Sequence, residues 1–182
     1  MTTVMKVLYR PTENHVGIIY SKWGKFKRFA NPNEWTFISS GFEEVTQEIR
    51  LDMRTTVLTL ENVFTSDMVA VDIEMKAYYS VDIRKTSEDK RVQALRFEGD
   101  LPWQEIVKTT VTDIVRNIVV ISHPYKELAT DDGLAYLKRV ISGHAASRLR
   151  SFGILINNRF AVSIMSFQPN KILQEALQEV SA

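Results

Sequence analysis

The chain has 182 residues, of which 45% are hydrophobic and 25% charged, and these values suit one compact folded domain. Its 23 basic and 22 acidic residues leave a net charge of +1, which excludes a general electrostatic attraction for nucleic acid or anionic lipid. The absence of cysteine excludes disulfide frameworks, thiol catalysis and cysteine-bound zinc, and it fits a reducing compartment.

Hydrophobic runs are short throughout the sequence. The longest, such as Met68 to Val71, fall far below the roughly 18 residues that a membrane-spanning helix requires. Residues 1–10 also lack the basic-then-apolar order of a secretory signal. We therefore expect any membrane contact to be peripheral, or to be made by residues outside this sequence.

The first half of the chain is predicted to be β-structure, because apolar and polar residues alternate between short turns. The first strands expected are residues 16–20, 25–29, 35–39 and 44–51. Gly24, Asn31-Pro32-Asn33 and Gly41 separate them, and these residue types favour turns. The pattern predicts a twisted antiparallel sheet.

A longer hairpin is predicted next, from residues 54–64 and 68–81. The link Thr65-Ser66-Asp67 has the short polar side chains that favour a tight turn. In the second strand every other residue is apolar, and these residues are Val69, Val71, Ile73, Met75, Ala77, Tyr79 and Val81. This strand is expected to have one buried and one solvated face.

The period of the hydrophobic pattern then lengthens to that of helices. Thr86 and Asp89 predict a capping box at the start of a short helix. A second helix is predicted from Pro102, with the buried stripe Trp103, Val107, Val111, Ile114, Ile118 and Ile121. A third is predicted from Asp131-Asp132 to Gly153, with the stripe Leu134, Leu137, Ile141, Ala145 and Leu149.

The end of the chain predicts one more strand, over residues 154–164, and then the start of a C-terminal helix over 169–182. The predicted fold class is α+β. A twisted antiparallel sheet lobe precedes an α/β lobe with two amphipathic helices packed on a small sheet, and the last helix starts a coiled coil. We expect one domain over 1–182, with sub-lobes at about 13–66 and 67–168.

Four short segments lie in the predicted strands or where one predicted element meets the next. They are Val16-Gly17-Ile18-Ile19, Thr65-Ser66-Asp67-Met68-Val69-Ala70-Val71, Tyr79-Ser80-Val81-Asp82 and Phe152-Gly153-Ile154. Gly17 would allow a close approach in a strand, and Gly153 would end a helix. With these segments in this order, the sequence from Glu13 to the C-terminus resembles the SPFH domain, the prohibitin-homology or Band 7 domain of stomatins, prohibitins and flotillins.

The resemblance implies a non-enzymatic scaffold that self-associates and organises a membrane patch or regulates a membrane protein complex such as a protease. It implies a peripheral location on the cytoplasmic side of a membrane. The expected partners are further copies of the chain and membrane lipid or a membrane protein. Relatives generally carry a membrane-embedded segment, which this sequence lacks. A soluble cytoplasmic adaptor or shell-forming module without membrane contact is therefore the alternative.

The sequence contains no constellation that predicts catalysis. His15, His123 and His144 have no partner at metal-ligand spacing. Glycine loops of the nucleotide-binding type are missing, and Ser39-Ser40-Gly41 lacks the frame of a nucleophile elbow and predicts a turn. We expect no catalytic residue, cofactor, metal or small-molecule substrate. An enzyme whose site is assembled from scattered residues remains a weaker alternative.

One segment combines positive charge with aromatic residues and has no acid. Its residues predicted to contact a membrane are Lys22, Trp23, Lys25, Phe26, Lys27 and Arg28. Basic residues are attracted by anionic headgroups, while aromatic rings settle at the interface. A hairpin with inward aromatics and solvated charges is the alternative; binding of nucleic acid by stacking is not expected.

A second candidate surface lies at the C-terminus. The residues predicted to mediate oligomerisation are Leu173, Ala176, Leu177 and Val180. Apolar residues at steps of three and four require a partner helix, as at the start of a coiled coil. A short helix packed on its own domain is the alternative.

Overall fold

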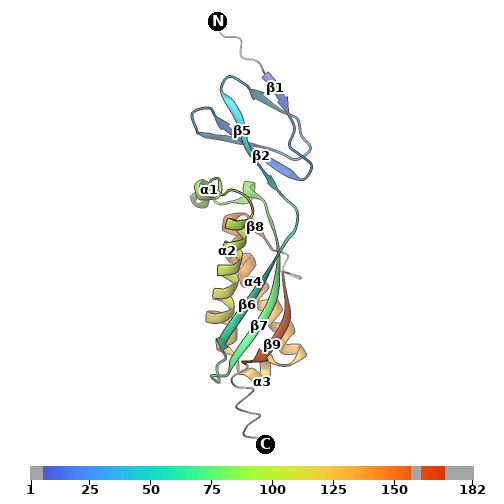
Figure 1. The fold of residues 1–182 in the computed structure, drawn as a ribbon, viewed down its shortest axis with the longest axis vertical. Coiled ribbons are helices and arrows are strands. Elements are labelled where there is room, and N and C mark those ends of the chain that lie inside the picture. The colour runs from blue at the N-terminus through green and yellow to red at the C-terminus, as the bar shows by residue number, and fades with distance from the viewer. Residues whose placement is uncertain (1–5, 157–160, 171–182) are drawn as a thin grey trace, which may run out of the picture.

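The computed structural model describes residues 6–156 and 161–170 and shows an elongated molecule (Figure 1). The first strands form small sheets at one end, and the helices and a longer sheet occupy the other. The strands are β1 (Lys6–Tyr9), β2 (His15–Ser21), β3 (Phe26–Ala30), β4 (Thr36–Ser39), β5 (Glu43–Arg50), β6 (Arg54–Phe64), β7 (Ala70–Val81), β8 (Ile154–Leu155) and β9 (Val162–Pro169). The helices are α1 (Glu88–Ala94), α2 (Leu101–Ile114), α3 (Tyr125–Leu128) and α4 (Asp131–Leu149).

Strand β2 is the centre of the N-terminal end and is buried on both faces. It pairs antiparallel with β3 and β5, while β1 and β4 pair in a separate two-stranded sheet. On one face Ile19 packs with Ala30 and Ile38. On the other face Val16 and Ile18 join the main core. Burial on both faces explains why this strand is a nearly continuous apolar run.

Gly17 of β2 makes room for the ring of Tyr9. A Cβ at Gly17 would lie 2.7 Å from the Tyr9 hydroxyl oxygen. The Tyr9 hydroxyl donates a hydrogen bond to Glu48 of β5, which holds the ring in place. The predicted close approach at Gly17 is therefore confirmed, and it joins the β1–β4 sheet to β2.

Strand β7 organises the second sheet. It pairs with β6 along one edge and with β8 and β9 along the other. Every second side chain is buried, and these are Val71, Ile73, Met75, Ala77, Tyr79 and Val81. The predicted β6–β7 hairpin is confirmed. The strand starts at Ala70 instead of Met68, because Met68 (φ 61°) closes the turn in a left-handed conformation.

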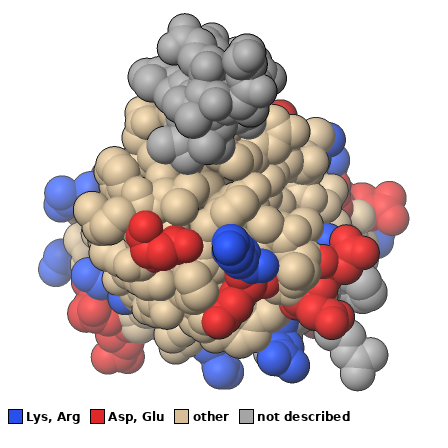
Figure 2. Space-filling model, turned by 90° about the horizontal axis from the view of Figure 1, so that it is seen from below, with Lys and Arg blue, Asp and Glu red and all other residues tan. Residues whose placement is uncertain are grey.

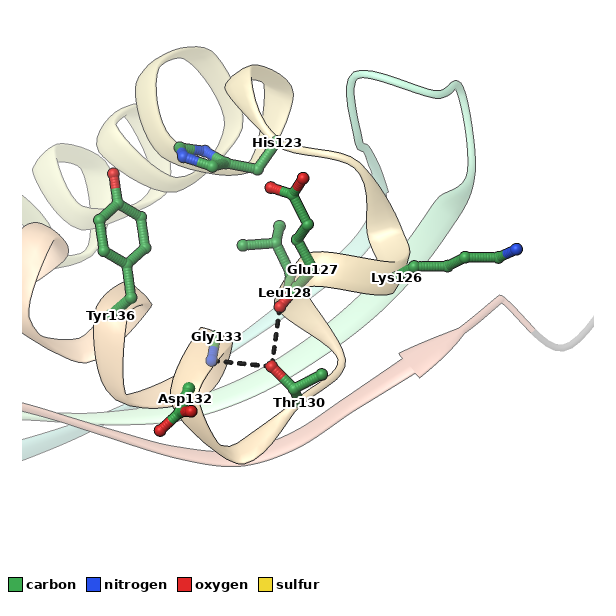
Figure 3. A pocket seen from close by; sticks show the side chains of 8 residues that line it. All are labelled: His123, Lys126, Glu127, Leu128, Thr130, Asp132, Gly133 and Tyr136. Atoms are coloured by element: carbon green, nitrogen blue, oxygen red, sulfur yellow. Dashed lines mark hydrogen bonds between the residues drawn. The ribbon is translucent and has the colours of Figure 1, made fainter.

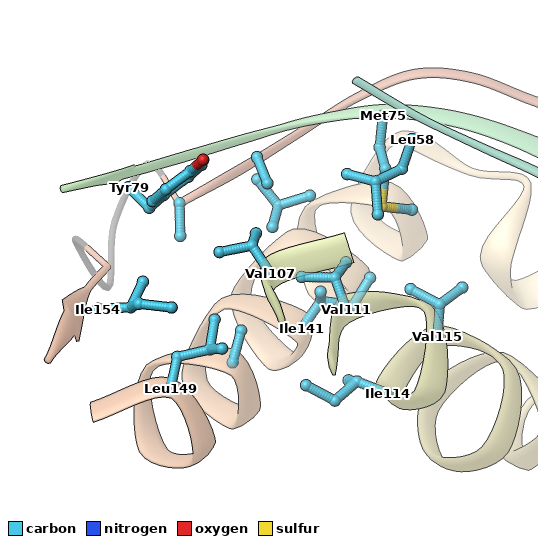
Figure 4. Packing of buried hydrophobic residues seen from close by; sticks show 14 of the residues in the cluster. Leu58, Met75, Tyr79, Val107, Val111, Ile114, Val115, Ile141, Leu149 and Ile154 are labelled. Atoms are coloured by element: carbon cyan, nitrogen blue, oxygen red, sulfur yellow. The ribbon is translucent and has the colours of Figure 1, made fainter. Parts of the chain in front are cut away.

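Helices α2 and α4 cover one face of this sheet and complete the core (Figure 4). The buried residues of α2 are Trp103, Val107, Val111 and Ile114. Those of α4 include Leu137, Ile141, Ala145 and Leu149. The α+β fold class is thus confirmed, with two amphipathic helices on an antiparallel sheet.

The helix after β7 starts one residue later than predicted. Thr86 is not its N-cap, because Thr86 follows a 3-10 turn, Ile83–Lys85, and donates its hydroxyl to the Phe152 carbonyl at 3.2 Å. Ser87 takes the N-cap position of α1. The predicted capping box was therefore wrong in its first residue.

Helix α2 ends earlier than its apolar stripe suggested. At Ile114 the chain widens into a π-helical segment, Val115–Val119, followed by a 3-10 turn, Val120–Ser122. The wider turn rotates the buried face by about one residue. Val115, Val119 and Val120 are buried as a result, whereas Ile121 is 49% exposed.

The single strand predicted over residues 154–164 is divided in the structure. β8 pairs with Ser80 and Val81 of β7, and β9 pairs with residues 71–77 of the same strand and extends to Pro169. β7 is long enough for β8 and β9 to pair with different parts of it. Residues 171–182 lie outside the described part of the chain, so the C-terminal helix and coiled coil stay predictions.

Asp82, directly after β7, links the two ends of the molecule. Its carboxylate accepts hydrogen bonds from Arg84 Nε at 2.8 Å and Nη2 at 2.9 Å. Arg84 Nη1 donates to Asn31 Oδ1, in the β3–β4 turn, at 3.0 Å. Burial alone would raise the pKa of Asp82, but the hydrogen bonds and charge of Arg84 outweigh burial and hold the pKa below its usual value.

The helix α4 ends at Leu149 and continues as a 3-10 turn, Arg150–Phe152, which Gly153 closes; the predicted stop at Gly153 is thus the end of this turn. Gly153 has a φ of 73°, and a Cβ there would lie 2.6 Å from the Asp82 carbonyl oxygen. The Asp82 amide donates to the Gly153 carbonyl at 2.8 Å, so the chain enters β8 against the end of β7. The two sub-lobes stay a proposal, and the pairing of β6 with β7 favours a division before Arg54.

Gly133 and Gly143 lie in the same helix, α4, and offer a matched pair of substitutions. A Cβ at Gly133 would lie 2.1 Å from the Glu127 carbonyl oxygen, whereas a Cβ at Gly143 meets nothing within 4 Å. We expect Gly133→Ala to lower the free energy of unfolding by about 1–3 kcal/mol, because the backbone must shift. Gly143→Ala should raise it by up to about 1 kcal/mol through helix propensity. Urea unfolding measures both, and equal effects would contradict this packing.

Candidate functional site

The basic and aromatic segment forms the β2–β3 hairpin at the N-terminal end (Figure 1). Ser21 N donates to the Lys25 carbonyl at 2.8 Å, and Gly24 adopts a φ of 75° at the turn. Lys22, Lys25 and Lys27 are all exposed. The hairpin therefore directs three exposed ammonium groups to solvent from a short, hydrogen-bonded turn.

Trp23 at the tip of this hairpin is 73% exposed. Its ring lies 5.9 Å from that of Phe42, centroid to centroid, and Lys22 N donates to the Phe42 carbonyl at 2.9 Å. Phe42 belongs to the β4–β5 turn and is itself 45% exposed. We name Lys22, Trp23, Lys25 and Phe42 the hairpin tip, because the two turns form one surface.

Arg28 and Phe26, the other residues expected at a membrane, are engaged within the protein. Arg28 Nη1 donates to Glu43 Oε1 at 2.5 Å, and Nη2 donates to the Phe37 carbonyl at 2.7 Å. Phe26 packs edge-on against Tyr20, with ring centroids 6.0 Å apart. The alternative of inward aromatics thus describes Phe26, while Trp23 and the three lysines point to solvent.

A second apolar surface, which the sequence analysis missed, lies on the β1–β4 sheet. Leu8 pairs with Phe37 across the two strands, and these side chains are 52% and 61% exposed. Trp35, directly before β4, is 63% exposed, with the Arg10 guanidinium 5.9 Å from its ring centroid. The alternation of Trp35, Thr36, Phe37 and Ile38 was the available signal. It did not reveal which face would be covered.

A pocket of about 560 Å³ opens between α3 and the start of α4 (Figure 3). The His123 and Tyr136 rings lie 5.0 Å apart at its wall, and Glu127 is another of its lining residues. His123 Nδ1–H donates to the Val119 carbonyl at 3.1 Å. A backbone carbonyl therefore orients the imidazole, and no carboxylate–histidine pair of the kind used in general-base catalysis is present at this pocket.

Within residues 6–156 and 161–170, no group of three or more His, Asp or Glu is arranged to hold a metal ion. None of the helices described is long and apolar enough to cross a membrane. At the end that carries α3, basic and acidic side chains are interspersed around a largely uncharged centre (Figure 2).

The family model described as SPFH domain / Band 7 family matches residues 12–182. The chain belongs to this family. Its SPFH domain is of the type found in stomatins, prohibitins and flotillins, a family of generally non-enzymatic scaffold domains that commonly oligomerise and associate with membranes. The comparison with curated proteins found no match. The resemblance inferred from the sequence is thus confirmed.

The ion pair behind the hairpin of this SPFH domain gives a test of the geometry. Hydrogen bonds from Arg28 and from the Ser39 amide outweigh burial and lower the pKa of Glu43. A carboxylate whose pKa is lowered by folding stabilises the protein above its unfolded pKa, and this stabilisation is lost as the pH falls through the folded pKa. Glu43→Gln should therefore lower the free energy of unfolding by about 1 kcal/mol at pH 7.

The difference between Glu43→Gln and the unmodified chain should shrink in acid, once the carboxyl is protonated in both the folded and the unfolded state. Glu44→Gln is the control, because Glu44 is the exposed neighbour on the same strand. Urea unfolding at a series of pH values measures both variants. A loss that does not depend on pH would argue against the ion pair.

Proposed function

We propose that this SPFH domain is a non-enzymatic, oligomerising scaffold that organises a membrane patch or regulates a membrane protein complex such as a protease. It acts at the cytoplasmic side of the membrane as a peripheral module. The single observation that carries this proposal is the family match over residues 12–182. The exposed hairpin tip supports the membrane part of it.

The hairpin tip suits an anionic leaflet for electrostatic and geometric reasons. Lys22, Lys25 and Lys27 are exposed within one short hairpin, and basic residues near such a surface each contribute about 1 kcal/mol. Trp23 is held against Phe42 with most of its surface in solvent, and tryptophan is favoured at headgroup depth. Local charge thus compensates for a net charge of only +1.

Self-association is proposed to involve the C-terminal stripe. Leu173, Ala176, Leu177 and Val180 recur at the spacing of a coiled-coil seam. They lie outside the described residues, so the proposal rests on the sequence pattern and on the family's common oligomerisation.

A soluble adaptor or shell-forming module is the second candidate. It uses the same fold and the same self-association without lipid. The exposed Leu8, Trp35 and Phe37 would then face a protein partner instead of a membrane.

Reversing the charge of the hairpin tests the membrane proposal. We expect the variant Lys22→Glu, Lys25→Glu and Lys27→Glu to bind anionic liposomes at least about a hundredfold more weakly, from about 1 kcal/mol per basic residue. Arg28 is left unchanged because it pairs with Glu43. Liposome flotation with phosphatidylserine, at low and high salt, measures the effect.

The matched control for this experiment reverses Lys126, Lys138 and Arg139, which are exposed on α3 and α4 and alter the net charge equally. This control should keep its binding to liposomes. If the unmodified chain does not float with anionic liposomes, the adaptor is favoured. Equal losses in both variants would show a dependence on net charge alone.

The assembly proposal has a separate test. We expect Leu173→Asp with Leu177→Asp to lower the molar mass measured by light scattering, because a buried charge disrupts a coiled-coil seam. Gln174 and Gln178, which the sequence pattern predicts to lie outside the seam, provide the control, as Gln174→Asp with Gln178→Asp should keep the mass. A monomeric unmodified chain would argue against a scaffold.

A further inference from the structure

The outer edge of β6 has no strand beside it among the described residues. β6 pairs with β7 over Arg54–Phe64, and no other strand in residues 6–156 and 161–170 pairs with it. From Thr55 to Leu60 the strand has neither charge nor proline. Natural sheet edges are usually protected by lysine, proline or a covering element. This edge lacks the first two over six residues of its length.

Strand β9 forms the opposite edge of the same sheet. It pairs with β7 and with no other strand of the described residues. From Val162 to Gln168 it carries no charged residue. A bulge interrupts its pairing between Glu74 and Met75 of β7, and Met165 lies at that bulge. Each edge of this sheet therefore has an uncharged stretch, Thr55–Leu60 in β6 and Val162–Gln168 in β9.

An exposed apolar side chain lies on each edge at nearly the same level. Val57 of β6 is opposite Lys76 of β7, which is opposite Ser163 of β9. Met165 lies two residues further along β9. Val57 is 47% exposed and Met165 is 51% exposed. A second molecule placed beside the first in the plane of the sheet would bring these two side chains into contact.

The directions of β6 and β9 also permit the sheet of one molecule to continue into the sheet of a second. β6 and β9 are both antiparallel to β7 and thus run parallel to each other. β9 of a second molecule can therefore lie parallel to β6 of the first, with the helix layers on the same side. α2 packs against β6 and α4 against β9, so the helix layer continues with the sheet. Such a contact joins two different edges and can repeat from molecule to molecule.

We propose that β6 of one copy pairs with β9 of a second copy, so that the sheet of one SPFH domain continues into the next. This inference rests on the proposed self-association and names its surface within the folded domain. The second copy is the occupant because the same chain supplies two edges with uncharged stretches, in compatible directions, with Val57 and Met165 at nearly matching levels. Main-chain hydrogen bonds between the edges provide the contact, as in other strand additions.

Engineered disulfides test this pairing, because the chain has no cysteine of its own. Adjacent strands lie about 4.8 Å apart, which is within the Cα separation of about 4.4–6.8 Å that a disulfide spans. The full chain carrying Val57→Cys and Met165→Cys should form a ladder of crosslinked multimers under mild oxidation. β7 separates the two positions within one molecule, so crosslinks between molecules are expected.

Each single variant discriminates between arrangements. Val57→Cys alone and Met165→Cys alone should stay monomeric on non-reducing gels, since the contact joins unlike edges. A dimer from Val57→Cys alone would overturn the proposal in favour of a two-fold contact between β6 strands. Val92→Cys with Met165→Cys is the control; Val92 is 62% exposed on α1, which packs against the 3-10 turn Arg150–Phe152, and this pair should give no ladder.

A second variant keeps the test independent of disulfide chemistry. Val57→Lys places a charge on the β6 edge and should reduce the molar mass in light scattering while the melting temperature is unchanged. An unmodified chain that is oligomeric, together with no crosslinking and no effect of Val57→Lys, overturns the edge pairing and leaves the scaffold function standing. A monomeric unmodified chain overturns both.

Discussion

The burial of one face of β7 is the constraint on which the rest of the structure depends. Its six inward side chains pack against α2 and α4, while its two edges hold β6 on one side and β8 and β9 on the other. A shift of one residue in the register would turn all of these side chains to solvent. The two helices, the hairpin and the two late strands are therefore positioned by a single strand.

Hydrogen bonds at the end of β7 connect the second sheet to the N-terminal strands. Asp82 is buried and accepts two hydrogen bonds from the Arg84 guanidinium and one from the Arg84 amide, and the guanidinium also reaches Asn31 in the β3–β4 turn. Breaking one partner of such a pair would leave a charge unsatisfied, which costs more than the pair itself contributes. The position of the hairpin tip relative to the helices thus depends on a residue far from it in the sequence.

The scaffold proposal agrees with the distribution of exposed apolar side chains over the structure. In the pocket beside Tyr136, the His123 ring is hydrogen-bonded to the Val119 backbone carbonyl. In contrast, large exposed side chains gather at the N-terminal end, on the hairpin tip and on the β1–β4 sheet. Exposed apolar groups of this size are typical of contact surfaces. These exposed groups are the features of the described residues that support the scaffold proposal.

The sequence by itself determined the α+β class, the β6–β7 hairpin, the two amphipathic helices and the family, because periods of two and of three to four residues directly reflect which face is buried. It also located the basic hairpin. Only the tertiary structure decided that Arg28 pairs with Glu43 and that Phe26 turns inward, since both depend on partners brought close by strand pairing. The π-helical turn after α2 and the division of the last strand into β8 and β9 were equally hidden. Each follows from fitting against β7, and local propensity contains no information about such non-local contacts.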